Sequence, residues 1–115
     1  MTLCNTSPKT QTKNLDRFNH YHAVVGLITR NQKVLITQRV REPFQGFWEY
    51  PGGKIEKDEG AFQALKRELI EEIAIEIQHA TPIMSLNPRD KIWITIHHVT
   101  AYLKTPQPME NQNMR

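Results

Sequence analysis

The sequence predicts a single α/β domain (α+β) in which a mixed β-sheet packs against one central helix. Two apolar, β-branched runs come first, a segment with helical spacing follows, and a long run with strand character comes after it. The chain has 115 residues, enough for one domain and too few for two. Hydrophobic residues make up 38% and charged residues 23%, so the composition excludes a wholly disordered chain.

The first residues and the overall charge indicate the setting of this domain. Residues 1–19 are polar and show no period, so we predict a loose leader before a domain over residues 20–115. The single cysteine, Cys4, excludes an internal disulfide framework and favours a reduced, cytoplasmic setting.

We expect no membrane span, because no apolar run reaches the ~20 residues that one needs. The net charge of +3 is compatible with a polyanionic ligand.

The first half of the domain predicts two strands and an irregular link. Residues 23–28 are apolar and β-branched, which is typical of a buried strand. Residues 30–32 form a hairpin turn, and residues 33–39 form the returning strand. The aromatic stretch of residues 43–50 is irregular, and the breaker Pro51-Gly52-Gly53 ends it.

A helix is predicted over residues 60–73. Its apolar residues recur at helical spacing and form one stripe: Phe62, Leu65, Leu69 and Ile73. After the helix, residues 75–77 form a short strand and residues 82–86 are extended. Residues 87–90 form a turn, residues 91–103 form a long strand, and residues 105–115 form a polar tail.

Three glutamates lie on one face of the predicted helix. Glu68, Glu71 and Glu72 stand at i, i+3 and i+4, which brings their Cβ atoms to about 5–6 Å from one another. Alone, such a face is more often simply solvated. Clustered carboxylates are also the ligands that Mg²⁺ prefers, usually one or two of them together with substrate phosphates.

The surroundings of these glutamates favour the metal site. The pattern G-x5-E-x7-R-E-U-x-E-E-x-G-U, with U aliphatic, is matched at Gly53, Glu59, Arg67, Glu68, Glu71 and Glu72, and its aliphatic positions at Leu69 and Ile75. This segment resembles the Nudix box. One position departs: the glycine that ends the helix is Ala74 here. Since helices often close with a residue at positive φ, we expect a strained or re-routed helix end.

The resemblance implies a catalytic site and a cofactor. Glu68, Glu71 and Glu72 match the family's metal-binding glutamates, and the backbone carbonyl of Gly52 matches a further ligand, for Mg²⁺ or alternatively Mn²⁺. Glu59 and Arg67 match a pair that braces the loop against the helix and completes the catalytic set. The metal polarises a bridging phosphate and activates a water for attack on phosphorus.

The flanking segments narrow the resemblance to the MutT branch. Residues 47–56 and 34–39 look like MutT segments, which implies hydrolysis of 8-oxo-dGTP to the monophosphate and pyrophosphate, a nucleotide-pool cleansing and DNA-repair activity. Arg39 matches a nucleotide-holding arginine and Glu110 matches a glutamate of the metal and water site. We expect Arg39, Gly53 and Lys54 to contact substrate. Alternatives remain open for three of these residues. Arg39 could be an exposed strand arginine, Glu110 a tail carboxylate, and Lys54 a lysine that covers the sheet edge.

The family fold is an α/β/α sandwich whose chain continues beyond the element Glu110-Asn111-Gln112. We therefore expect the last strand and the C-terminal helix to be missing, which would leave apolar surface and a strand edge exposed. The base-selecting region would be missing with them.

Two other hypotheses stay open. The substrate could be another nucleotide, a nucleotide sugar or a dinucleoside polyphosphate, or the chain could be a non-catalytic, truncated Nudix module. We expect a small-molecule nucleotide partner and no binding of duplex nucleic acid, because no basic stretch is interleaved with aromatic residues. The oligomeric state stays undetermined. His97 and His98, adjacent on a strand, should point to opposite faces and so not share a metal.

Overall fold

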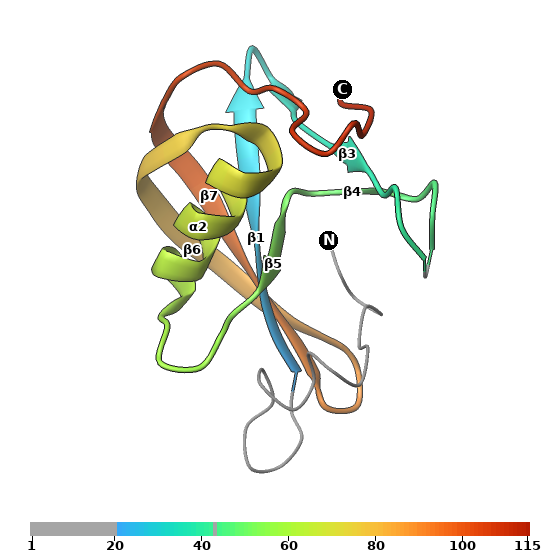
Figure 1. Ribbon diagram of the computed structural model, residues 1–115. Helices are drawn as coiled ribbons and strands as arrows, with labels where there is room; N and C mark the ends of the chain where they lie inside the picture. Colours follow the sequence, from blue (N-terminus) through green and yellow to red (C-terminus); the bar gives the residue numbers. More distant parts are fainter. Residues whose placement is uncertain (1–20, 43) are drawn as a thin grey trace.

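A computed structural model describes residues 21–42 and 44–115, so the predicted leader lies outside the described residues. One helix packs on a mixed sheet, and a short two-stranded ribbon stands to the side (Figure 1). The elements, in chain order, are β1 (Tyr21–Arg30), β2 (Lys33–Val34), β3 (Thr37–Gln38), β4 (Trp48–Glu49), β5 (Gly52–Lys54), α2 (Ala61–Ile73), β6 (Glu76–Arg89) and β7 (Ile92–Leu103).

The main sheet has five strands and confirms the predicted mixed pairing. Its order is β2-β1-β7-β6, and β5 pairs with β1. β1 and β7 are parallel, while the other pairs are antiparallel. Within the described part of the chain, one helix covers one face of this sheet, so two of the three expected layers are described.

The core has two parts, one on each face of the sheet. On the helix face, Leu65, Leu69 and Ile73 are fully buried in one cluster with side chains of β1, β6 and β7, and Phe62 packs at the edge of this cluster. This confirms the predicted stripe, and each fully buried leucine stabilises the fold by roughly 2 kcal/mol. The second face carries another buried cluster: Tyr21, Ala23, Val25, Ile92, Ile94 and Ile96.

Of the strands predicted after the helix, residues 91–103 are confirmed as β7, whereas the prediction for the segment before it was wrong. β6 is one strand of 14 residues, where two short pieces were expected, and the turn lies at residues 90–91 instead of 87–90. Four register shifts interrupt its pairing with β7, one of them between Pro82 and Met84. Bulges break the alternation that a sequence reading relies on, and an edge strand tolerates proline because its outer N–H has no ladder partner.

The first half of the domain also differs from its prediction. The returning strand is split, because residues 33–34 pair with β1 while residues 37–38 pair with β4 in the separate ribbon. Residues 43–50 include β4, and the expected breaker forms β5. Gly52 makes this pairing possible: a Cβ there would collide with the Val24 carbonyl.

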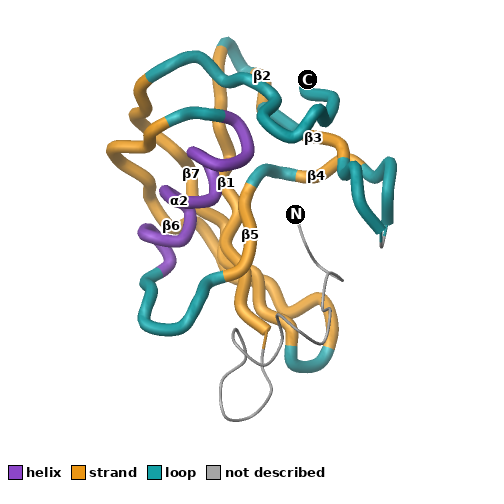
Figure 2. The backbone as a smooth tube through the Cα atoms, viewed as in Figure 1, coloured by secondary structure: helices purple, strands orange, loops and turns teal. Residues whose placement is uncertain are grey.

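The polar tail is docked onto the ribbon. The backbones of Ile36 and Arg115 exchange two hydrogen bonds of 2.9 and 3.0 Å, and the Gln38 N–H donates to the Asn113 carbonyl. Figure 2 shows the end of the chain lying beside β3. Large apolar side chains are 40–50% exposed on the β6–β7 hairpin, at Ile83, Met84, Leu86 and Trp93.

Candidate active site

The site is built where β5 passes over α2. The loop between them brings Glu59 back toward the helix, and α2 begins after Gly60, whose N–H donates to the Gln63 side chain at 3.0 Å. The helix ends at Ala74, which takes the left-handed conformation with φ 62°. This confirms the strain expected there, about 1 kcal/mol for a residue with a Cβ.

Arg67 ties the loop to the helix. Its Nε and Nη2 donate to the two carboxylate oxygens of Glu59 at 2.8 and 3.0 Å, a bidentate pair. Nη2 also donates to the Lys54 carbonyl at 3.0 Å. Hydrogen bonding from Arg67 lowers the pKa of Glu59, and the same contact raises the pKa of Arg67. The predicted brace is therefore present as a fixed link between three segments.

Glu68 lies directly beneath the backbone of β5. A Cβ on Gly53 would collide with the Glu68 carboxylate, so glycine is what allows this close approach. Glu68 Oε1 accepts a hydrogen bond from Arg67 Nη1 at 2.9 Å. Burial nevertheless raises the pKa of Glu68, since it outweighs the opposing effect of Arg67.

Glu72 is the most strongly perturbed carboxylate. Its Oε1 accepts the Gly52 N–H at 3.3 Å. Burial raises the pKa of Glu72 to about 8, and the charges of Glu68 and Glu110 act in the same direction. A positive charge beside this carboxyl group would lower its pKa and favour the ionised form.

Glu71 lies apart from these two. Its side chain is 59% exposed and its Oε1 is 3.4 Å from Arg67 Nη1. Among the described residues, no three His, Cys, Asp or Glu side chains converge closely enough to hold a metal ion by themselves. The predicted trio shares a helix face, but the structure brings only Glu68 and Glu72 under β5. This arrangement suits Mg²⁺, which keeps several waters and commonly shares one or two carboxylates with phosphates.

The free edge of β5 faces the helix. Pro51 and Ile55 bond to β1, while the Lys54 carbonyl and the Gly52 N–H bond to side chains of α2. Because carbonyls two residues apart on a strand point the same way, the Gly52 carbonyl is also turned from β1 toward the carboxylates. A metal there would find a backbone oxygen beside Glu68 and Glu72.

Two predicted substrate contacts are largely buried. The Lys54 ammonium lies 5.2 Å from the centroid of the Tyr21 ring, and burial lowers its pKa. This placement agrees with the alternative in which Lys54 covers the sheet. Arg39 Nη1 is 3.7 Å from Glu49 Oε2 and its side chain is 9% exposed, so Arg39 is not an exposed strand arginine.

Glu110 lies in an exposed turn after β7. The negative charge of its carboxylate contributes to the raised pKa values of Glu68 and Glu72. Sequence reasoning missed the residue that holds this turn. Gln112 is 6% exposed, accepts the Glu110 N–H at 2.8 Å and donates to the Glu72 carbonyl at 2.9 Å. The sequence signal was the Glu110-Asn111-Gln112 element itself, in which only the glutamate was assigned a role.

The two histidines point to opposite faces, as predicted. His98 Nε2 is 3.0 Å from the Thr29 hydroxyl, whereas His97 is buried and its Nδ1 has no hydrogen-bond partner among the described residues. Burial lowers the pKa of His97. Both belong to the sheet rather than to the carboxylate site.

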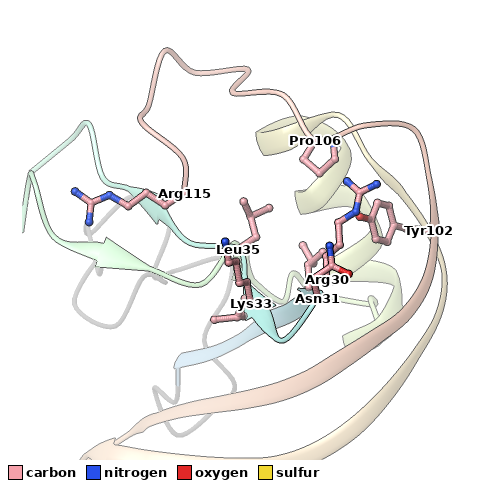
Figure 3. A pocket seen from close by; sticks show the side chains of 9 residues that line it. Arg30, Asn31, Lys33, Leu35, Tyr102, Pro106 and Arg115 are labelled. Carbon is pink, nitrogen blue, oxygen red and sulfur yellow. The ribbon is translucent and has the colours of Figure 1, made fainter.

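A cavity of about 280 Å³ lies away from the carboxylates. Its lining comes from the β1–β2 hairpin, the end of β7 and the last residue of the chain (Figure 3). None of the predicted site residues lines it. Across the described residues, no helix has the length and apolar character to cross a membrane.

Known proteins resemble this chain in sequence. The family model described as NUDIX domain matches residues 20–114. A CTP pyrophosphohydrolase of Escherichia coli K12 is 39% identical over 94 residues, which cover 77% of this chain and 69% of that protein. An 8-oxo-dGTP diphosphatase of Proteus vulgaris is 45% identical over 62 residues, 52% of this chain and 55% of that protein. The chain thus spans about half the length of the second relative.

Solved structures resemble it in fold. A MutT structure, from work on the Aliivibrio salmonicida and Vibrio cholerae proteins, has a TM-score of 0.75 and 34% identity over 84% of this chain and 77% of its own. The solution structure of the Escherichia coli ORF135 protein has a TM-score of 0.70 and 35% identity over 84% of this chain and 71% of its own. Box, fold and relatives agree, and the chain belongs to the Nudix family as a MutT-like hydrolase.

Proposed function

We propose that the protein hydrolyses a nucleoside triphosphate in a Mg²⁺-dependent reaction, with 8-oxo-dGTP as substrate. The observation that carries this proposal is the pair of buried carboxylates, Glu68 and Glu72, held under the glycine backbone of β5. The reaction adds one water across a phosphoanhydride bond and releases the nucleoside monophosphate and pyrophosphate.

The metal ligands in this proposal are Glu68, Glu72 and the Gly52 carbonyl, with Glu71 and Glu110 at the rim. Their chemistry fits a hard cation, because every donor is an oxygen. Glu72 is also buried beside the negative charges of Glu68 and Glu110, which a cation would neutralise. When bound, a divalent cation, Mg²⁺ or Mn²⁺, polarises a bridging phosphate and lowers the pKa of an attacking water.

The remaining site residues hold these donors in place. The bidentate Glu59–Arg67 pair fixes the loop, and Arg67 also holds Glu68 and the end of β5. Gly53 lets the backbone of β5 approach the Glu68 carboxylate closely, and in this proposal the same backbone also contacts a substrate phosphate. Arg39, held beside Glu49, contacts the nucleotide in this proposal.

The choice of 8-oxo-dGTP rests on the Proteus vulgaris relative and on the MutT structure. The activity would cleanse the nucleotide pool in the cytoplasm and so avoid mutation. CTP is the second candidate, because the Escherichia coli CTP pyrophosphohydrolase is matched over a longer part of this chain.

Pyrophosphate release from 8-oxo-dGTP, dGTP and CTP with Mg²⁺ tests the proposal. We expect release from 8-oxo-dGTP at the highest kcat/KM, and a loss of about two orders of magnitude in Glu72→Gln and Glu71→Gln, the scale of a lost catalytic group. A preference for CTP would support the second candidate. Stabilisation by Mg²⁺ without turnover of any nucleotide would favour the non-catalytic module, and unchanged activity in both variants would contradict the metal site.

A further inference from the structure

The segment after β7 closes over the end of α2. The Gln107 N–H donates to the Ile73 carbonyl at 2.8 Å, and the Met109 N–H donates to the Glu72 carbonyl at 3.0 Å. These bonds satisfy carbonyls that a helix end otherwise leaves without partners. The segment thereby lies against the same turn of helix that presents Glu72 to the site.

One side chain joins this segment to the helix by both ends of its amide. Gln112 donates from Nε2 to the Glu72 carbonyl at 2.9 Å, and its Oε1 accepts the Glu110 N–H at 2.8 Å. Asn111, between them, adopts φ 60°, a left-handed conformation that asparagine tolerates better than most residues. The backbones of two acidic residues, 38 positions apart in the sequence, are thus linked through a single buried amide.

We propose that Gln112 is a positioning residue that holds the turn carrying Glu110 against the end of α2, so that the Glu110 side chain can join Glu68 and Glu72 at the metal site when a cation is bound. This inference rests on the proposed function, since it assigns the organisation of that same site. It adds a residue with no charge and no contact of its own with substrate.

The contacts distinguish positioning from a merely structural role. The Glu72 carbonyl already accepts from the Met109 N–H, so it keeps a partner if the Gln112 amide is removed. The Glu110 N–H, in contrast, donates to Gln112 alone within the part of the chain that the structure describes. Loss of the amide should therefore free the turn that carries Glu110 more than it unravels the helix end.

The test compares Gln112→Met with Asn113→Ala. Methionine has nearly the length of glutamine and no amide, while Asn113 makes a matched tie of the same segment to Gln38 at 2.8 Å, away from the helix. Mn²⁺ affinity by electron paramagnetic resonance and the Mg²⁺ concentration for half-maximal activity are measured for both. We expect Gln112→Met to lower the Mn²⁺ affinity and to raise the Mg²⁺ concentration for half-maximal activity, each about tenfold, the usual scale for groups that orient ligands. Asn113→Ala should change neither quantity by more than about twofold.

A double-mutant cycle with Glu110→Gln identifies the residue through which Gln112 acts. In the Glu110→Gln background, Gln112→Met should have little further effect on Mn²⁺ affinity. An undiminished tenfold effect there, or equal effects of the two variants, overturns the proposal. Amide hydrogen exchange needs no substitution: the Glu110 N–H should exchange as slowly as that of Met109, and exchange at the rate of a free loop also overturns it.

These outcomes are separate from those of the proposed function. If the wild-type protein binds Mn²⁺ more tightly than Gln112→Met does but hydrolyses none of the nucleotides, the proposed function fails and the positioning role stands. If it hydrolyses 8-oxo-dGTP and Gln112→Met leaves Mn²⁺ affinity and Mg²⁺ dependence unchanged, the positioning role fails alone.

Discussion

Glu72 combines burial with negative neighbours, and this has a consequence for stability. Its pKa of about 8 in the folded protein lies above the ordinary value of 4.5. Between these two pH values the folded state binds more protons than the unfolded state, so stability falls as the pH rises through this window. A residue proposed to bind the metal is therefore one that destabilises the metal-free fold in this pH window.

We therefore expect Glu72→Gln to raise the Tm of the metal-free protein at pH 8 by several degrees, and to leave it nearly unchanged at pH 4.5. Thermal melts in chelator across this range check the expectation. The exposed Glu71→Gln serves as the matched control, since its side chain is 59% exposed. Parallel pH dependence in the wild type and Glu72→Gln would contradict the burial argument.

Arg67 acts through the geometry of its guanidinium. A lysine keeps the charge but loses the fork that grips both Glu59 oxygens and reaches the Lys54 carbonyl. We expect Arg67→Lys to lower the free energy of unfolding by roughly 1–3 kcal/mol, the scale of hydrogen bonds to charged groups. Urea melts measure this, with the exposed neighbour Lys66→Arg as control; an Arg67→Lys variant as stable as the control would refute it.

For single residues, the sequence predicted which side chains would lie near the site better than it predicted their contacts. The Nudix box identified Glu59, Arg67, Glu68 and Glu72, because its spacing fixes positions along a helix and its loop. The element Glu110-Asn111-Gln112 was recognised, but the role of Gln112 was not, since its bond to Glu72 joins residues 40 positions apart and depends on how the last loop folds back. The burial of Arg39 likewise depends on β4, which pairs through the non-local ribbon.

Among the elements, α2 and β7 were predicted to within one residue and β1 was found, whereas β5 and β6 were not predicted as they stand. The stripe of residues 62–73 is a local pattern, and α2 begins and ends within one residue of the prediction. β5 and β6 depend on pairing with β1 and β7, and neither the glycines of β5 nor Pro82 in β6 are typical of a strand. Tertiary pairing overrode local propensity in both.

The end of α2 offers a stabilising substitution. Ala74 at φ 62° carries the cost of a Cβ in the left-handed region, which glycine avoids. We expect Ala74→Gly to raise the free energy of unfolding by about 0.5–1 kcal/mol, once the greater freedom of glycine in the unfolded chain is subtracted. Activity should stay within about twofold.

Chemical denaturation of Ala74→Gly beside Ala64→Gly checks this expectation. Ala64 is buried inside the same helix, where glycine should instead cost about 1 kcal/mol. If both substitutions changed the free energy of unfolding in the same direction, the left-handed conformation of Ala74 would not be a source of strain.

For the whole molecule, the small number of converging side-chain ligands predicts that metal and nucleotide stabilise the fold together. Since no three acidic side chains converge in the described part of the chain, a cation must draw further ligands from water and phosphate. We expect Mg²⁺ alone to raise the Tm by no more than about 2 °C, and Mg²⁺ with a non-hydrolysable nucleoside triphosphate to raise it by several degrees more. A full shift with Mg²⁺ alone would indicate a preformed cage.

The bonds from Gln107, Met109 and Gln112 to the end of α2 also set an order of events during synthesis. The helix and its glutamates leave the ribosome more than 30 residues before the segment that closes over them. Until that segment arrives, the nascent chain holds a row of acidic side chains on a helix whose last carbonyls face water. The proposed metal site would thus stay incomplete until the chain has been made as far as Gln112, so metal binding would report that this segment has been synthesised.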